Sequence, residues 1–410
     1  MSKEKKLIPE LRFPDFEKDG EWEEKSLKNV SDVTMGSSPK SSSYNNNKIG
    51  LPLLQGNADI KNRLSAPRIY TSEITKECQI DDILLSVRAP VGTIAKSIHR
   101  ACIGRGISAI HAKNENSQEY LYQWLFSFES SWQNISQGGT FDAVNSDDIR
   151  NLKLPIPNTK EQQKIASCLS TLDELLAAHN DKLDALKDHK KGLLQNLFPQ
   201  EGETVPKVRF SEFEGDGDWV EKTIGEVFDS FSGSTPKSTE KKYYGGNIPF
   251  IRSAEIAKDS TELFLTNEGL KNSSAKLIKK GDLLVALYGA NSGDVAVSKI
   301  DGAINQAILC LRSAFSNSFT HQYLSFKKEW IVSRYIQGGQ GNLSGEIVKS
   351  IELQFPEKKE QQKIASCLSA VDELIIAQAD KIEQLQQHKK GLMQGLFPNP
   401  SASSGETIES

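Results

Sequence analysis

The chain has 410 residues, which is more than one hydrophobic core usually organises and indicates two or more domains. Its composition is typical of a globular protein, and its net charge of −4 gives no overall basic signal for nucleic acid. No apolar run approaches the roughly 20 residues of a membrane span, and five cysteines without Cys-x-x-Cys spacing argue against a disulfide framework or a zinc site. We therefore expect a cytoplasmic protein with no signal peptide, no metal site and no contact with a membrane.

The first part of the chain predicts a compact, loop-rich α/β domain. Apolar and β-branched runs bounded by Gly, Pro, Asn and Asp predict strands at 83–87, 93–98 and 107–111. A helix is expected over 118–136, with aromatic side chains on one face and a Gln-Gly-Gly sequence at its end. Trp22 is expected to be a core anchor rather than a base-stacking platform.

A long helix is predicted next, between Pro157 and Pro199. Its apolar positions alternate steps of four and three, the pattern of a coiled-coil seam. About 38 residues at 1.5 Å per residue give a length of about 57 Å. The seam residues are Ile165, Leu169, Leu172, Leu176, Leu183, Leu186 and Leu193, and the polar residues His179 and Lys190 fill the remaining places.

The second half of the chain repeats the first. The sequence KEQQKIASCLS occurs at 160–170 and again at 359–369, and Gly-Ser-Ser-Pro-Lys at 36–40 is matched by Gly-Ser-Thr-Pro-Lys at 233–237. Trp219 matches Trp22. Strands are expected at 283–287, 295–300 and 304–311, followed by a helix from about 320 to 336. The chain is therefore a tandem duplication in which the first part of each copy has diverged and the tail has not.

The second tail predicts a second long helix with the same seam. Its seam residues are Ile364, Leu368, Val371, Ile375, Ile382, Leu385 and Leu392, with Gln378 and Lys389 in the polar places. Because one helix cannot bury such a stripe alone, we expect the two helices to pair antiparallel around a pseudo-twofold axis. The alternative is that each helix packs only on its own domain.

Together these features resemble the specificity (S) subunit of type I DNA restriction–modification systems. The features that carry the resemblance are the proline-then-Glu-Gln starts of both long helices, the Gly-x-x-Pro-Lys turns, the Gln-Gly-Gly sequences, and Gly281-Asp282-Leu283-Leu284 followed by Asn305-Gln306-Ala307. The resemblance covers nearly the whole chain. The first copy departs from it, since Arg105-Gly106-Ile107 stands where the Asn-Gln-Ala signature would fall.

The resemblance implies a fold of mixed α/β class. It consists of two tandem α/β target recognition domains separated by two long helices that form an intramolecular antiparallel coiled coil. The implied segments are a first recognition domain at 1–155, a spacer helix at 156–199, a second recognition domain at 200–355, a second spacer helix at 356–398 and a flexible tail at 399–410.

The resemblance also implies a function without catalysis. Each recognition domain would read one half of a split, asymmetric site on double-stranded DNA, and the helices would dock two modification (methyltransferase) subunits. Restriction subunits, which are translocases and endonucleases, would complete the complex. No cofactor is expected on this chain, because S-adenosylmethionine, ATP and Mg would be used by the partner subunits.

Candidate DNA contacts lie on or beside loops rich in Gly, Ser and Pro. Arg and Lys suit guanine and phosphate, whereas Asn and Gln suit adenine. For each candidate, the alternative is a solvated loop residue or a structural turn. The candidates are Lys40, Arg88, Arg105 and Thr140 in the first copy, and Lys237, Arg252, Tyr288, Asn291, Asn305 and Gln340 in the second.

Two other functions are weighed against this one. A self-contained enzyme is disfavoured, because the sequence lacks the Pro-Pro-aromatic loop of an adenine methyltransferase and the Gly-x-x-x-x-Gly-Lys-Ser/Thr loop of an ATPase. A coiled-coil scaffold or adaptor that has lost DNA reading stays open. Sequence-specific, salt-sensitive DNA binding in the presence of a modification subunit would distinguish the two.

Overall fold

The computed structural model describes residues 7–113, 115–132, 143–313, 315–335 and 342–398. The chain forms two compact units: unit 1 comprises 1–180 and 381–410, and unit 2 comprises 181–380. Each unit therefore holds one divergent region, the beginning of one long helix and the end of the other. The tail expected at 399–410 lies outside the described residues, and the five predicted segments stay a prediction.

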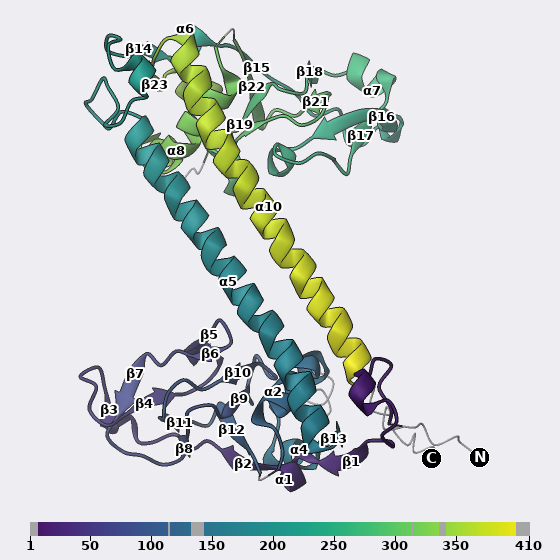
Figure 1. The fold of residues 1–410 in the computed structure, drawn as a ribbon. Coiled ribbons are helices and arrows are strands. Elements are labelled where there is room, and N and C mark those ends of the chain that lie inside the picture. The colour runs from purple at the N-terminus through teal and green to yellow at the C-terminus, as the bar shows by residue number, and fades with distance from the viewer. Residues whose placement is uncertain (1–6, 114, 133–142, 314, 336–341, 399–410) are drawn as a thin grey trace. The chain divides into compact units, whose positions relative to one another are not determined.

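The two long helices are α5, Thr159–Leu197, and α10, Lys358–Leu396. Each has 39 residues, close to the predicted length, and each is unbroken in Figure 1. Short strands precede them, β13 at Lys153–Ile156 and β23 at Glu352–Phe355, and prolines flank both helices. The prolines explain these limits, since an internal proline removes a helical hydrogen bond.

The long helices run antiparallel, as predicted. In unit 1 the beginning of α5 meets the end of α10, where Lys389 Nζ lies 2.6 Å from Asp173 Oδ1. In unit 2 the end of α5 meets the beginning of α10, where Lys190 Nζ lies 2.6 Å from Asp372 Oδ1. Both helices also contribute to the core of each unit. The alternative in which each helix packs only on its own domain is therefore wrong.

The predicted seam positions are all at least half-buried. Four of the buried positions, Ile165, Leu169, Ile364 and Leu368, also belong to the domain cores. The contribution of each seam side chain to pairing stays a prediction. The buried residues are Ile165, Leu169, Ile364, Leu368, Val371 and Ile382; the half-buried ones are Leu172, Leu176, Leu183, Leu186, Leu193, Ile375, Leu385 and Leu392.

Unit 1 contains two larger sheets and a two-stranded ribbon. The six-stranded sheet has the order β2-β12-β9-β10-β6-β5 and the five-stranded sheet the order β3-β7-β4-β11-β8, while β1 pairs antiparallel with β13. The bounds are β1 Glu23–Ser26, β2 Ser31–Met35, β3 Tyr44–Asn45, β4 Leu51–Leu54, β5 Ile60–Lys61, β6 Leu64–Ser65, β7 Ile69–Thr71, β8 Glu77–Cys78, β9 Ile83–Ser86, β10 Ile94–Lys96, β11 Ala101–Ile103 and β12 Ile107–Ala112. The helices are α1 Leu27–Val30, α2 Gln118–Ser127 and α4 Ser146–Asn151.

Unit 2 repeats this plan with fewer strands. Its sheets have the orders β15-β22-β19-β20 and β17-β16-β21-β18, and β14 pairs antiparallel with β23. The bounds are β14 Val220–Thr223, β15 Asp229–Ser232, β16 Tyr244–Ile251, β17 Phe264–Leu265, β18 Lys276–Ile278, β19 Leu283–Ala286, β20 Val295–Val297, β21 Gly302–Ile304 and β22 Ile308–Arg312. The helices are α6 Ile224–Val227, α7 Asn267–Lys271, α8 Asn317–Tyr335 and α9 Gly345–Lys349.

Two predicted elements need correction. The helix expected over 118–136 ends at Ser127, whose hydroxyl donates a 2.6 Å hydrogen bond to the Trp124 carbonyl. A short 3-10 helix at Glu129–Ser131 follows. The strand expected at 304–311 is two strands in different sheets, β21 and β22, because Asn305–Ala307 form a turn between them. The Gln-Gly-Gly sequences at 137–139 and 337–339 lie outside the described residues.

The cores explain the matching tryptophans. Trp22 is 4% exposed and Trp219 is 3% exposed, which confirms both as core anchors. Trp22 packs edge-on against Tyr120 in unit 1, and Trp219 packs against Phe198 and Phe319 in unit 2. Over the described parts of the chain, no helix is both long enough and apolar enough to span a membrane.

Candidate nucleic-acid interface

In unit 1 the Gly-x-x-Pro-Lys turn lies against the loop between β11 and β12. The Gly36 amide donates to the Ile107 carbonyl at 3.0 Å, and the Ser37 amide donates to the Ile103 carbonyl at 2.9 Å. A Cβ atom on Gly36 would lie 2.1 Å from the Gly104 carbonyl oxygen, so only glycine permits this approach. The turn that carries Lys40 is thereby held beside the loop that carries Arg105.

Two more loops join the same end of the sheets. The Gly106 amide donates to the Gln55 carbonyl at 3.1 Å, and the Val87 amide donates to the Gly106 carbonyl at 3.0 Å. Gln55 follows β4 and Val87 follows β9. We call these four segments (36–40, 55–57, 87–92 and 104–106) the loop cluster of unit 1.

Three of the predicted DNA-contact residues lie in this cluster. Lys40, Arg88 and Arg105 are all exposed. Arg105 contacts Ser38 Oγ through its amide at 3.2 Å and its Nε at 3.4 Å, which steadies the base of the side chain. The structure brings the loops of these three residues together, whereas Thr140 lies outside the described residues.

Unit 2 builds an equivalent loop cluster from segments 233–237, 252–255, 287–293 and 305–307. A Cβ on Gly233 would lie 1.7 Å from the Ile304 carbonyl oxygen, so this turn also needs glycine. Thr235 Oγ1 donates to Gln306 Oε1 at 2.6 Å, and the Leu287 amide donates to the Ala307 carbonyl at 2.8 Å. The two units therefore present the same arrangement of loops with different side chains.

The predicted residues of the second cluster divide into two groups. Lys237 and Tyr288 are exposed and their side chains face solvent. Asn291 Nδ2 donates to Asp294 at 3.1 Å, and Asn305 Oδ1 accepts from the Ala307 amide at 3.1 Å. The last contact is the structural-turn alternative that the sequence left open for Asn305. Gln340 lies outside the described residues.

Arg252 is held by two carboxylates. Its guanidinium lies 3.0 Å from Glu255 and 2.6 Å from Glu262. The hydrogen bond from Arg252 lowers the pKa of the buried Glu255 carboxyl to about 2. Arg252 therefore organises the loop after β16, and a DNA contact by it stays a prediction.

Sequence reasoning missed Gln55. It occupies in unit 1 the place of Arg252 in unit 2, since each directly follows a strand paired in parallel with β11 or β21. Gln55 is half-buried, and its Nε2 donates to the Tyr44 hydroxyl at 3.1 Å. The Gln55-Gly56-Asn57 sequence, a polar loop around a glycine, was the available signal.

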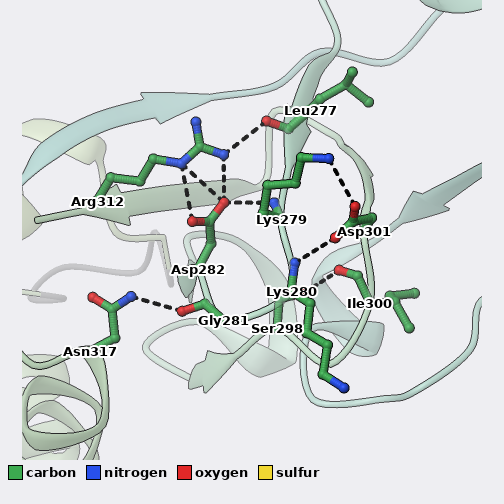
Figure 2. A network of polar contacts seen from close by, with 10 residues as sticks. All are labelled: Leu277, Lys279, Lys280, Gly281, Asp282, Ser298, Ile300, Asp301, Arg312 and Asn317. Atoms are coloured by element: carbon green, nitrogen blue, oxygen red, sulfur yellow. Dashed lines mark hydrogen bonds and ion pairs between the residues drawn. The ribbon is translucent and has the colours of Figure 1, made fainter.

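Basic residues elsewhere in unit 2 serve a different purpose. At the beginning of β19, the end opposite the Tyr288 loop, Asp282 accepts hydrogen bonds from the Arg312 guanidinium and from the Lys279 amide (Figure 2). Lys279 Nζ pairs with Asp301 at 2.9 Å. Burial raises the pKa of Asp282, but the hydrogen bonds outweigh it and the net pKa is lowered. This network anchors a strand end.

The repeated Glu-Gln-Gln motif is largely internal. Glu161 and Glu360 are 1% and 0% exposed, and each binds an arginine, Arg12 or Arg209. Gln162 Oε1 accepts from the Ser117 amide at 2.9 Å while its Nε2 donates to the Pro157 carbonyl at 2.9 Å. These bonds fasten each long helix to its domain.

Another face of each long helix is solvent-exposed and repeated. We call it the exposed repeat face. It includes apolar Leu175, 41% exposed, and Leu374, 56% exposed. Its residues are Lys160, Gln163, Ser167, Glu174 and Leu175 in unit 1, and Lys359, Gln362, Ser366, Glu373 and Leu374 in unit 2.

Residues 19–188 and 216–387 match the family described as the type I restriction modification DNA specificity domain. The two matches cover most of the chain, one in each copy, and the chain belongs to this family. Its members are the non-catalytic specificity subunits of type I restriction–modification systems, so the prediction that this chain is not an enzyme is confirmed.

Individual relatives support this family assignment. The MjaIX specificity subunit of a type I restriction enzyme from Methanocaldococcus jannaschii is 26% identical over 298 residues, 68% of each chain. Another protein from this organism, MjaX, is 33% identical over 181 residues, and that region spans 43% of each chain. The S subunit of a type I restriction–modification system from M. genitalium superposes with a TM-score of 0.66 at 17% identity, covering 96% of this chain and 100% of that one. This likeness shows the fold.

Proposed function

We propose that this chain reads a bipartite, asymmetric site on double-stranded DNA, with one half-site for each recognition domain. The observation that carries the proposal is the pair of loop clusters. Both units hold the same four loops in the same arrangement, yet Arg88 in one cluster corresponds to Tyr288 in the other. Arg105 corresponds to Gln306 rather than to Asn305, because the carbonyl of the following residue accepts from the Val87 amide in unit 1 and from the Leu287 amide in unit 2. A common scaffold with different loop side chains is what two different DNA words require.

The second part of the proposal concerns docking of two methyltransferase subunits. Identical partners need self-similar surfaces, and the exposed repeat face supplies one on each long helix. The buried residues of the repeat are explained by contacts within the chain, without identical partners. Gln162 is identical in both copies, and its hydrogen bonds to Ser117 and Pro157 account for it within the chain.

Chemistry is assigned to the partners. In the proposed complex, S-adenosylmethionine is used by the methyltransferase subunits, while ATP and Mg are used by the restriction subunits. Within the parts of the chain that the structure describes, no group of His, Cys, Asp and Glu is placed to hold a metal ion. The role of this chain is to select the DNA site and to hold the partners there.

The test is a single-molecule methylome of host DNA with and without the gene. Loss of one split, asymmetric methyl-adenine motif on deletion is the expected result, and it would identify both half-site words. An unchanged methylome with a methyltransferase subunit present would contradict the proposal and favour the scaffold or adaptor function.

A direct binding assay distinguishes DNA-site reading from the scaffold or adaptor function. The chain with its methyltransferase subunit should bind DNA that contains the motif more tightly than bulk DNA, and this binding should weaken steeply with salt. An adaptor would assemble with the methyltransferase subunit and show no preference between the two DNAs.

A further inference from the structure

Two lysines occupy polar places in the seam, whose other polar places hold His179 and Gln378. The lysines are Lys190 on α5 and Lys389 on α10, at equivalent positions of the duplication. Each ammonium lies 2.6 Å from an aspartate of the other long helix, Asp372 in unit 2 and Asp173 in unit 1. The lysine side chains are 21% and 7% exposed and those of their aspartates 32% and 40%, so the ammonium groups are the more buried partners of these ion pairs.

Each aspartate is also held by the recognition domain. Gln123 Nε2 of α2 donates to Asp173 Oδ2 at 2.7 Å, and Gln322 Nε2 of α8 donates to Asp372 Oδ2 at 2.7 Å. The carboxylate is therefore positioned by the domain helix as well as by the lysine of the other long helix. Three elements join at each pair: the domain helix, its own long helix and the opposite long helix.

Both pairs require the same antiparallel register. Lys190 follows Asp173 by 17 residues on α5, and Lys389 follows Asp372 by 17 residues on α10. A slip of one heptad in either direction would place Ala365 or Ala379 opposite Lys190, and Ala166 or Asn180 opposite Lys389. None of these residues carries a carboxylate, so both ammonium groups would lose their aspartate partners.

A seam of apolar residues alone distinguishes poorly between registers that differ by one heptad. Its leucines and isoleucines recur every heptad and can meet again after a slip of seven residues. A buried charge without a partner is strongly unfavourable, whereas a polar residue at a single seam position is an established means of fixing register. The domain cores, which contain residues of both long helices, favour the observed register, and the two lysines add a selection of register that the repeating seam residues alone do not make.

We propose that Lys190 and Lys389 are positioning residues that fix the register of α5 against α10 and thereby the number of unread base pairs between the half-sites. The link to the gap rests on the proposed function. One heptad is about 10 Å of helix, which corresponds to about 3 base pairs of DNA.

The test uses the complete methyltransferase complex and reads gap lengths in a methylome. The variant is Lys190→Ile with Lys389→Ile, which removes both lysines from the seam and leaves His179 and Gln378 as its polar residues. We expect methylation of the same two words at the original gap and at a second gap that differs by about 3 base pairs. Lys187→Ile, an exposed position on α5, should keep the single original gap.

A charge exchange provides the second variant. Asp173→Lys with Lys389→Asp, combined with Asp372→Lys and Lys190→Asp, keeps both pairs in the same register and should restore one gap. Full methylation at a single gap in the isoleucine variant would overturn the proposal. Loss of the helical circular-dichroism signal in the isoleucine variant would also overturn the proposal, because the lysines would then be needed for folding rather than for register. Absence of any split motif in the wild type would instead refute the proposed function.

Discussion

Arg12 and Glu161 form a bidentate ion pair in unit 1, with Nε 2.8 Å from Oε1 and Nη2 2.8 Å from Oε2. Their side chains are 8% and 1% exposed. Arg209 and Glu360 repeat the pair in unit 2. In each unit the residue before the arginine also bonds to the end of the other long helix, as the Leu11 amide does to the Gly395 carbonyl at 2.8 Å.

Breaking this pair should destabilise unit 1. Arg12→Met leaves the Glu161 carboxylate buried without its partner, and we expect a loss of about 3–5 kcal/mol in the free energy of unfolding. Urea denaturation followed by circular dichroism measures it. Arg12→Met with Glu161→Met should recover most of the loss, because an apolar pair replaces the charges. Lys25→Ala, at an exposed ion pair, should change little.

Neighbouring glutamines should behave differently. Gln162→Ala removes the partner of the Ser117 amide and of the Pro157 carbonyl, and we expect a loss of about 1–3 kcal/mol in the free energy of unfolding. Gln163→Ala, one residue further on and exposed, should leave stability unchanged. Thermal denaturation of both variants compares the same side chain in two environments. Equal melting temperatures would contradict the internal role of Gln162.

The exposed repeat face should contribute to partner binding. Leu175→Asp with Leu374→Asp places charges on exposed positions, so the chain should fold normally while its affinity for the methyltransferase subunit falls. Calorimetric titration of the subunit into the variant measures the change. Glu383→Lys, at an exposed site on α10 outside this face, is the control. Unchanged affinity in the leucine variant would place the docking surface elsewhere.

Substitution in one loop cluster should affect one half-site. Arg105→Ala should relax one position of the word read by unit 1, at a cost of about 1–3 kcal/mol in discrimination, and leave the other word intact. Lys40→Ala should weaken binding to all sequences and reduce the salt dependence by about one unit of slope. Competition binding with half-site variants tests both. An Arg105→Ala effect on both words would contradict separate reading.

Acid should weaken the loop after β16. The folded pKa of Glu255, about 2, lies below its ordinary value of 4.5, so this carboxylate stabilises unit 2 above about pH 4.5. That stabilisation, at most about 3 kcal/mol, is lost as the pH falls from 4.5 towards 2. The difference in unfolding free energy between wild type and Glu255→Gln should therefore shrink on acidification. Asp259→Asn, at an exposed carboxylate, should have the same unfolding free energy as the wild type at pH 6.

The sequence alone was sufficient for the duplication and the long helices, and it favoured their antiparallel pairing over packing of each helix on its own domain. These depend on local periodicity: the heptad spacing from Ile165 to Leu193 recurs from Ile364 to Leu392, and prolines mark the ends. It was less accurate at turns. Apolar periodicity does not reveal the end of α2 at Ser127 or the turn at Asn305–Ala307, where Asn305 Oδ1 accepts from the Ala307 amide.

Only the tertiary structure decided which polar residues face each other. Arg12 and Glu161 are 149 residues apart, and Asp173 and Lys389 are 216 apart, so no local pattern pairs them. The same holds for Gln55, which reaches the loop cluster because β4 lies beside β11. Periodicity records which face of an element is buried, whereas a specific contact depends on the path of the whole chain.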